Sequence, residues 1–377
     1  MTYKNITVVA KEGSYQSDVA VENGAIVRIG PDLRGSKSVD ASGMYLLPAL
    51  VDVGTNFSDG SFKGLSRVAQ KAQNSGVGYV VNTSKTDPVI NDETALQSLQ
   101  LKSSLEQCTF RSLINAKKDE GLSDMALLLN KGAAGIEIDS DYNLNTIARA
   151  YEYAKLKNKP VICHANSTSL QGGGMIASGK IANKLGIAGV SSLCESVEVV
   201  KIAHMAAHYG VETLFLNLAT KEGIDQSKSC LVSTSIHHLL LDQNSCRNFN
   251  TKAKMYPPLR EKLSGRLKDI DIITSMHAKT STANKELAFA QASFGVDALG
   301  EFLALCYTHL VKSGLLSMDE LMQKLAYNSA GLFGIDIALK EGSSAFALFD
   351  PSKSYRVSNS DSLYEGQQLW GQVLTSR

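Results

Sequence analysis

Histidines are the side chains of this sequence whose number and positions could support metal chemistry. Seven are present, and neutral imidazole is a common zinc ligand. His237, His238 and His277 each follow a strand-like apolar run, so they could line a common site with His164 and Asp139. Because the further ligands that a zinc site would need are missing, we interpret His164 as a hydrogen-bonded histidine at a strand end, and Asp139 in the same way. A metal site built from these residues is kept as the alternative.

A second pair, His204 and His208, has the four-residue spacing that places two side chains on one face of a helix. Zinc proteases with two histidines at this spacing carry a glutamate directly after the first, and here that position is Met205. Because no third ligand is nearby, we interpret the pair as solvated or partly buried. His309, inside an apolar helical run, is interpreted as structural.

The cysteines and the N-terminal segment indicate a compartment. Six cysteines are scattered without a C-x-x-C pair, which fits neither a zinc knuckle nor a disulfide framework. Cys163 precedes His164, and neighbouring strand residues point to opposite faces, which argues against a Cys-His dyad. The first residues lack the basic and apolar regions of a secretory signal. We therefore expect free thiols in a cytoplasmic protein.

Charge and composition limit the classes of partner. Lysine and arginine number 38 and aspartate and glutamate 37, for a net charge of +1, which argues against nucleic acid or an anionic membrane as a partner. Hydrophobic residues make up 44% of the 377 residues, without the uncharged run of about 18 residues that a membrane helix needs. A small molecule or another protein is the expected partner.

Short apolar runs alternate with helix-length segments through most of the chain. This pattern is typical of parallel strands buried on both faces, and it predicts an α/β fold with a (β/α)₈ TIM-type barrel. We expect the barrel to span 49–335, and residues 1–48 plus 336–377 to form one small β-sandwich domain. The predicted barrel strands are 49–53, 77–82, 110–116, 135–139, 160–165, 213–218, 231–237 and 271–275.

Several segments carry a family resemblance, partly at the strand ends where barrels place their active sites. They are Asn82-Thr83, Pro160-Val161-Ile162-Cys163-His164, Gly172-Gly173-Gly174-Met175, His237-His238-Leu239, Tyr256-Pro257-Pro258-Leu259-Arg260 and Leu363-Tyr364-Glu365-Gly366. Their order and spacing resemble dihydroorotase of the allantoinase-like type, a metal-dependent hydrolase of the amidohydrolase superfamily. The resemblance covers nearly the whole chain.

The resemblance implies a metal site whose first ligands come from strands one, four and five. In the family an H-x-H pair follows strand one, and Gly54 and Asn56 stand at those positions here. The bridging acid of strand four corresponds to Asp139, and His164 stands at the histidine of strand five. Two of these four positions therefore keep a metal-ligating side chain.

The remaining family positions are also altered. Asn217 replaces the histidine of strand six, and Ser275 replaces the aspartate of strand eight, which in active relatives binds metal and acts as the general base. Among substrate-binding positions, Asn82 is retained, whereas Ser58 replaces an arginine that binds the substrate carboxylate. The resemblance thus implies the fold without most of its catalytic groups.

These replacements lead to an expectation about catalysis. A catalytic zinc typically takes three protein ligands plus a water whose pKa it lowers to about 7. Two retained ligands are too few for this, and Ser275 cannot act as a general base. We therefore expect a non-catalytic dihydroorotase homologue with no cofactor. The alternative is a cyclic amidohydrolase with residual zinc at a site rebuilt from the histidines named above.

The resemblance also implies partners. Some bacterial aspartate carbamoyltransferases form a complex with an inactive dihydroorotase-like chain, which implies a structural or assembly role in pyrimidine biosynthesis with aspartate carbamoyltransferase as the partner. Relatives further imply a homodimer. A second alternative is a chain that binds a pyrimidine precursor without converting it, at a barrel mouth that retains Asn82.

Overall fold

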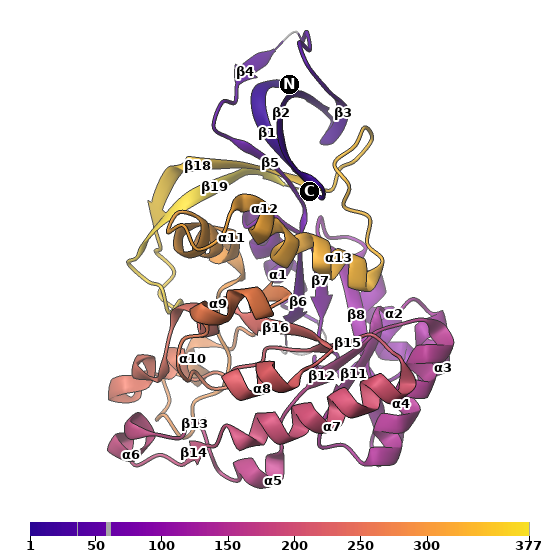
Figure 1. The fold of residues 1–377 in the computed structure, drawn as a ribbon, viewed down its shortest axis with the longest axis vertical. Helices are drawn as coiled ribbons and strands as arrows, with labels where there is room; N and C mark the ends of the chain where they lie inside the picture. Colours follow the sequence, from indigo (N-terminus) through magenta and orange to yellow (C-terminus); the bar gives the residue numbers. More distant parts are fainter. Residues whose placement is uncertain (36, 58–61, 377) are drawn as a thin grey trace.

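Eight parallel strands form the central sheet of the structure, a computed structural model that describes residues 1–35, 37–57 and 62–376 (Figure 1). They follow chain order along the sheet, and an isolated parallel bridge between Asn56 and Ala278 brings its two edge strands together. The barrel is therefore nearly closed, and the predicted fold class is confirmed. The strands are β6 (Leu50–Thr55), β7 (Val77–Asn82), β8 (Thr109–Asn115), β11 (Gly135–Asp139), β12 (Val161–His164), β15 (Thr213–Phe215), β16 (Leu231–Ser235) and β17 (Ile272–Thr274).

Helices lie outside this barrel, as Figure 1 shows for α4, α7 and α8. Local signals set their ends: the Asp92 side chain caps α2 by accepting from the Ala95 N–H at 2.9 Å, and α4 ends at Asn158 in the left-handed conformation. The helices are α1 (Leu65–Asn74), α2 (Glu93–Ser103), α3 (Met125–Asn130), α4 (Leu144–Lys157), α5 (Thr168–Gln171), α6 (Lys180–Leu185), α7 (Leu193–Tyr209), α8 (Lys221–Gln226), α9 (Ile236–Leu240), α10 (Thr282–Lys285), α11 (Phe302–Cys306), α12 (Met318–Met322) and α13 (Asn328–Phe333).

Two short strand pairs lie in the loops: β9 (Lys117–Lys118) pairs with β10 (Gly121–Leu122), and β13 (Ile176–Ala177) pairs with β14 (Gly189–Val190). Among the helices of the described residues, none combines the length and the apolar character needed to cross a membrane.

The two chain ends together form a separate seven-stranded sheet, seen above the barrel in Figure 1. Its order is β19-β18-β5-β1-β2-β3, with β4 pairing with β1. Both ends contribute strands, as expected, while the domain boundaries stay a prediction. The strands are β1 (Thr2–Ala10), β2 (Gly13–Glu22), β3 (Ala25–Gly30), β4 (Ser38–Asp40), β5 (Tyr45–Pro48), β18 (Phe346–Arg356) and β19 (Gln368–Ser376).

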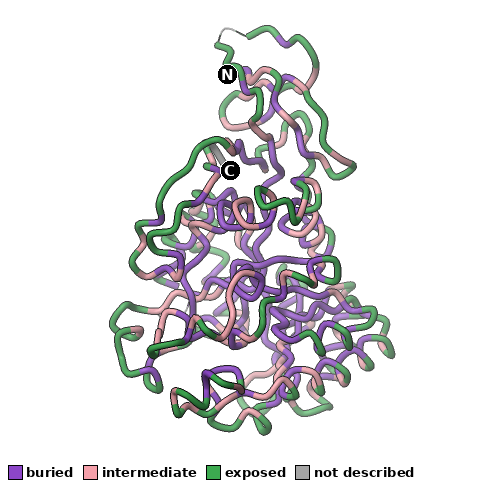
Figure 2. The backbone as a smooth tube through the Cα atoms, turned by 60° about the vertical axis from the view of Figure 1, so that its left-hand side comes forward, coloured by how far each residue is buried: buried purple, intermediate pink, exposed green. Residues whose placement is uncertain are grey.

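Apolar packing holds the sheet and the barrel together. One buried cluster runs through the barrel strands and the surrounding helices and continues into the sheet through Leu47, Ala347 and Phe349. Figure 2 shows the resulting buried interior. The Tyr327 hydroxyl adds a polar link, donating to the Val9 carbonyl at 2.9 Å. The site described below therefore rests on a rigid, packed scaffold.

Replacing Gly371 with alanine is expected to destabilise the protein by about 3 kcal/mol. Gly371 has a φ of +91°, and a Cβ there would overlap the buried Phe349 ring. Gly366→Ala is the matched control, because Gly366 has a φ of +77° with open space around it, so it carries only the backbone cost of about 1 kcal/mol. Urea unfolding of both variants measures the difference, and equal losses would contradict the predicted overlap.

Candidate functional site

The first predicted metal position, Gly54, has a backbone that suits glycine. Its φ is +87°, a conformation that L side chains rarely adopt, and the β6–β7 ladder shifts register between Val53 and Thr55. A Cβ at Gly54 would lie 3.0 Å from Cδ2 of Leu216. The end of β6 is therefore shaped around a residue without a side chain.

Asp52 and Ser275 form a buried hydrogen-bonded link between β6 and the end of β17. The Ser275 N–H donates to Oδ1 of Asp52 at 2.8 Å, and its hydroxyl donates to Oδ2 at 2.6 Å. The Thr55 hydroxyl donates to the same Oδ2 at 2.5 Å. Burial raises the pKa of Asp52, although these donors oppose the shift. The residue at the general-base position thus serves as a donor to a neighbouring carboxylate.

Asn217 is likewise engaged by its neighbours. It is buried and has a φ of +60°, in the left-handed region that asparagine tolerates better than most residues. Its Oδ1 accepts from the Thr274 hydroxyl at 2.5 Å, and its N–H donates to Oγ of Ser233 at 2.9 Å. The sixth-strand position therefore links the ends of three neighbouring strands, β15, β16 and β17.

The two retained ligands, His164 and Asp139, each pair with another side chain. His164 Nε2 lies 2.5 Å from Oε1 of Glu137, a fully buried carboxylate that also accepts the Ser84 N–H. Burial alone would raise the pKa of Glu137, but His164, Lys85 and the Ser84 N–H hold it at about 2. Lys85 Nζ donates to Oδ1 of Asp139 at 2.5 Å.

Two further predicted positions, Asn56 and Asn82, lie at the ends of β6 and β7. The Asn56 N–H donates to the His277 carbonyl at 2.7 Å, and its Oδ1 is buried without a hydrogen-bond partner. Asn82 is fully buried and donates to the Thr83 carbonyl and to Oγ of Ser112. Ser58 lies outside the described residues.

The histidines of the alternative metal site are buried and separately engaged. His237 Nδ1 lies 2.8 Å from the Tyr364 hydroxyl and its Nε2 lies 3.1 Å from the Ser275 carbonyl. His238 contacts Oγ of Ser235 and the Pro257 carbonyl. Burial lowers the pKa of His237 to about 3, and those of His238 and His277 to about 4. In the described ranges, no three His, Cys, Asp or Glu side chains gather closely enough to hold a metal ion.

The zinc that the family resemblance implies does not fit the described positions. Of these six, four carry no charged or imidazole donor: Gly54, Asn56, Asn217 and Ser275. His164 directs its Nε2 at Glu137, and Asp139 forms an ion pair with Lys85. Most of the polar side chains at these strand ends are hydrogen-bonded to one another, whereas Oδ1 of Asn56, Oδ1 of Asn82 and Oγ of Ser84 are buried without a hydrogen-bond partner among the described residues.

Sequence reasoning missed the partners that complete this network, above all Glu137 and Lys85. The alternation of strand residues places Glu137 on the same face of β11 as Asp139, and that signal could have identified it as a second candidate for contact with His164. No sequence signal pointed to the role of Asp52, which accepts the hydrogen bonds of Ser275.

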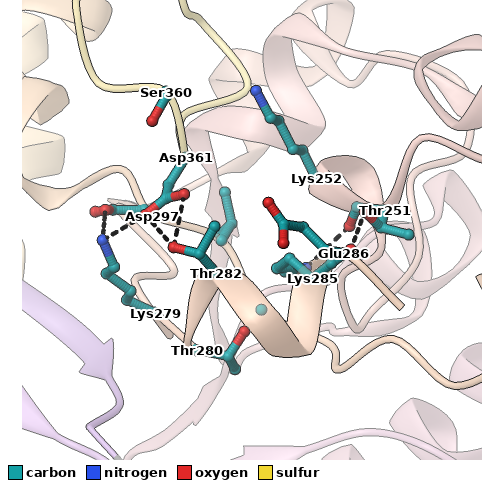
Figure 3. A pocket seen from close by; sticks show the side chains of 12 residues that line it. Thr251, Lys252, Lys279, Thr280, Thr282, Lys285, Glu286, Asp297, Ser360 and Asp361 are labelled. Carbon is teal, nitrogen blue, oxygen red and sulfur yellow. Dashed lines mark hydrogen bonds and ion pairs between the residues drawn. The ribbon is translucent and has the colours of Figure 1, made fainter. Parts of the chain in front are cut away.

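A separate cavity of about 270 Å³ lies beside α10 (Figure 3). Lys279 pairs there with Asp361 at 2.7 Å and with Asp297 at 3.2 Å. Lys285 Nζ donates to the Thr251 carbonyl at 3.0 Å. None of the six predicted ligand positions lines this cavity.

Replacing His164 with alanine is expected to lower the free energy of unfolding by about 3 kcal/mol at pH 7, because it leaves the buried Glu137 carboxylate without its imidazole partner. The pKa of Glu137 is about 2 in the folded protein and near 4.5 when unfolded. Its stabilising contribution is therefore present above pH 4.5 and is lost as pH falls toward 2. Denaturant unfolding from pH 3 to 7 should show a smaller pH dependence in His164→Ala, and an unchanged profile would contradict the pairing.

Replacing Ser275 with aspartate, the residue that the family resemblance implies at this position, is expected to destabilise the protein by about 2–4 kcal/mol at pH 7. The new carboxylate would lie against buried Asp52 and raise at least one pKa of the pair. Protonation in acid relieves the repulsion, so the loss should shrink as pH falls from 7 to 5. Ser275→Asn, of similar size and neutral, is the control for steric effects. A loss that is equal in both variants at every pH would contradict the electrostatic cause.

Comparison with known proteins gives relatives along the whole chain. No protein-family model matches. The chain is 29% identical to a dihydroorotase of Clostridioides difficile (strain 630), over 94% of this chain and 92% of the relative. It is 28% identical to a dihydroorotase of Ligilactobacillus salivarius (strain UCC118), over 96% and 93%.

Solved structures show the same fold. The L-hydantoinase (dihydropyrimidinase) of Arthrobacter aurescens superposes with a TM-score of 0.85 at 19% identity, covering 100% of this chain and 96% of that one. The D-hydantoinase (dihydropyrimidinase) of a Thermus species gives a TM-score of 0.81 at 21% identity, covering 99% and 92%. The chain is therefore similar in sequence to dihydroorotases over nearly its whole length, and it shares its fold with hydantoinases.

Proposed function

We propose that the chain is a non-catalytic dihydroorotase homologue that acts as a structural or assembly partner of aspartate carbamoyltransferase in pyrimidine biosynthesis. The loss of catalysis is supported by the hydrogen-bond network at the ends of the barrel strands. Ser275, at the general-base position, donates two hydrogen bonds to Asp52, and Gly54 has a backbone that disfavours any side chain.

Hydrolysis of a cyclic amide needs an activated water and a group that accepts its proton. The described ligand positions supply neither a zinc donor set nor a free carboxylate, because Asp139 is paired with Lys85 and Glu137 with His164. Side chains that satisfy one another in this way stabilise the barrel but do not activate water. The proposed loss of the reaction follows from these pairings.

The proposed partnership with aspartate carbamoyltransferase is supported by the family resemblance. A barrel that keeps its fold over nearly the full length of dihydroorotase relatives retains its outer surface as a possible docking platform even when the mouth has no chemistry. An assembly role therefore gives the preserved fold a function.

An active cyclic amidohydrolase is the competing function, and it is favoured by the similarity of the chain to proteins named dihydroorotase and hydantoinase. It requires a metal site that the described residues do not assemble. The two proposed functions therefore predict different zinc contents for the purified protein and different turnover of a cyclic amide.

Purified full-length protein, expressed with zinc supplementation, is expected to contain far less than one equivalent of zinc and to show no turnover of dihydroorotate. Elemental analysis and a turnover assay with added zinc make the measurement, with an active dihydroorotase as the positive control. Stoichiometric zinc, with turnover that disappears in a folded His164→Ala variant, would overturn the proposed loss of catalysis.

The assembly role is tested separately by light scattering after size exclusion of the chain mixed with aspartate carbamoyltransferase from the same organism. Both proteins are used at micromolar concentration, and a joint species heavier than either protein is expected. An unrelated carbamoyltransferase is the control. Two unchanged elution profiles would contradict the partnership while leaving the zinc result valid.

A further inference from the structure

Lys285, the last residue of α10, lies in the wall of the cavity of about 270 Å³ shown in Figure 3. Two other lysines of this wall have acidic partners: Lys252 pairs with Glu365, and Lys279 pairs with Asp361. In the described part of the chain, no Asp or Glu side chain forms an ion pair with Lys285. Its ammonium form therefore lacks the carboxylate that would stabilise the charge of a half-buried lysine.

Two backbone carbonyls hold the amine of Lys285 in place. Its Nζ donates to the Thr251 carbonyl and to the Lys254 carbonyl, each at 3.0 Å. A neutral primary amine carries two hydrogens and one lone pair. It can therefore keep both hydrogen bonds while its lone pair stays available to attack an electrophile.

The surroundings of Lys285 also favour the neutral amine. Burial and the nearby charge of Lys254 lower the pKa of Lys285 to about 8, and the Cys246 thiol opposes this shift. At pH 7.5 roughly a quarter of Lys285 is then neutral, against roughly 0.1% of a lysine with the ordinary pKa of about 10.4. A desolvated lysine beside another cationic group is the kind of amine that forms imines with carbonyl compounds.

The cavity lining indicates which carbonyl compounds would fit. Formal charges in the lining cancel, because three lysines face three acids: Lys252, Lys279, Lys285, Glu286, Asp297 and Asp361. A lining without excess charge favours an uncharged ligand over an anion or a cation. Hydroxyl side chains from four residues also line the cavity: Thr251, Thr280, Thr282 and Ser360. An uncharged molecule that carries hydroxyl groups matches this lining.

Thr280 offers a hydrogen-bonding group that the described residues leave unused. Its hydroxyl is buried and has no hydrogen-bond partner among them. Such a group costs free energy when it stays unpaired, and a hydroxyl of a ligand would supply the missing hydrogen bond.

A second ligand hydroxyl would compensate for a change at Lys285. A protonated imine has one N–H, so one of the two carbonyls that Lys285 contacts, those of Thr251 and Lys254, would lose its donor. A hydroxyl on the carbon next to the aldehyde could donate to that carbonyl instead.

We propose that the cavity beside α10 binds a small uncharged hydroxyaldehyde, which forms an imine with Nζ of Lys285. The nitrogen lone pair attacks the aldehyde carbon, and the carbonyl oxygen leaves as water with the two amine hydrogens. The resulting C=N bond can then take a proton from solvent, and no oxidant or reductant is involved. This site is separate from the strand-end positions and does not depend on the function proposed above.

Reductive trapping on the full-length protein tests the proposal, with glyceraldehyde as the probe and cyanoborohydride to reduce the imine to a stable amine. Peptide mass mapping over time gives the labelling rate of each lysine at pH 7.5. Lys285 is expected to react at least about tenfold faster than Lys353, an exposed lysine on β18. Equal rates at the two lysines would overturn the proposal.

Propionaldehyde, which has the same three carbons without the hydroxyl groups, tests the ligand class. The ratio of labelling at Lys285 to labelling at Lys353 is expected to be at least about fivefold lower with propionaldehyde, since hydrogen bonds to the ligand are lost. Thr280→Val should lower the glyceraldehyde ratio and leave the propionaldehyde ratio unchanged. Equal ratios for the two aldehydes in the wild-type protein would overturn the assignment to a hydroxyaldehyde.

Lys285→Arg keeps a positive charge and N–H donors for the two carbonyls, but a guanidinium does not form the imine. This variant should lose the fast adduct and keep the slow labelling of Lys353, with a circular dichroism spectrum like that of the wild type. Fast labelling that persists in Lys285→Arg would mean that another lysine reacts and would overturn the assignment. The comparison of the two aldehydes uses the wild-type protein, so it tests the site independently of the variants.

Discussion

One buried carboxylate, Asp52, links the two edges of the barrel. The parallel ladder runs without interruption from β6 round to β17, and within the described residues an isolated bridge between Asn56 and Ala278 pairs the backbones of the two edges. Asp52 on β6 accepts two hydrogen bonds from Ser275, the residue that follows β17. Burial of a carboxylate is unfavourable unless the carboxylate is hydrogen-bonded. The two Ser275 donors therefore link the edge strands β6 and β17, and they restrict which residue can stand at position 275.

The other strand ends follow the same constraint. Several polar side chains at the mouth have neighbouring side chains as partners: Thr274 for Asn217, Glu137 for His164 and Lys85 for Asp139. The pKa of Glu137, held at about 2, shows how strongly the surrounding donors favour its charged form. The hydrogen bonds and ion pairs between these side chains make the barrel mouth more rigid. In a hydrolase, groups at these strand ends would face a metal and a substrate.

The sequence was sufficient for the fold but not for the pairings at the site. All eight barrel strands were predicted close to their observed positions, because continuous apolar runs separated by helical segments have few other solutions. The contact of His164 was not predictable in the same way. The ladder places Asp139 directly beside His164, yet the longer side chain of Glu137 reaches the imidazole while Asp139 turns to Lys85. That choice depends on side-chain length and on a lysine from another strand end, neither of which a linear pattern encodes.

The backbone at Gly54 adds a constraint that side-chain identities alone do not reveal. A histidine at this position would have to adopt a φ near +87° and place its Cβ against Leu216, which costs about 1–2 kcal/mol in conformation before any packing strain. An aspartate at 275 would meet Asp52, and a histidine at 217 would lose the bond from Thr274. The residues at the predicted ligand positions therefore depend on the backbone of β6, on the hydrogen bonds between Asp52 and Ser275, and on the hydrogen bond between Asn217 and Thr274. Histidines at 54 and 217 and an aspartate at 275 would require several of these supports to change together, so the residues at these positions and the structure around them stabilise one another.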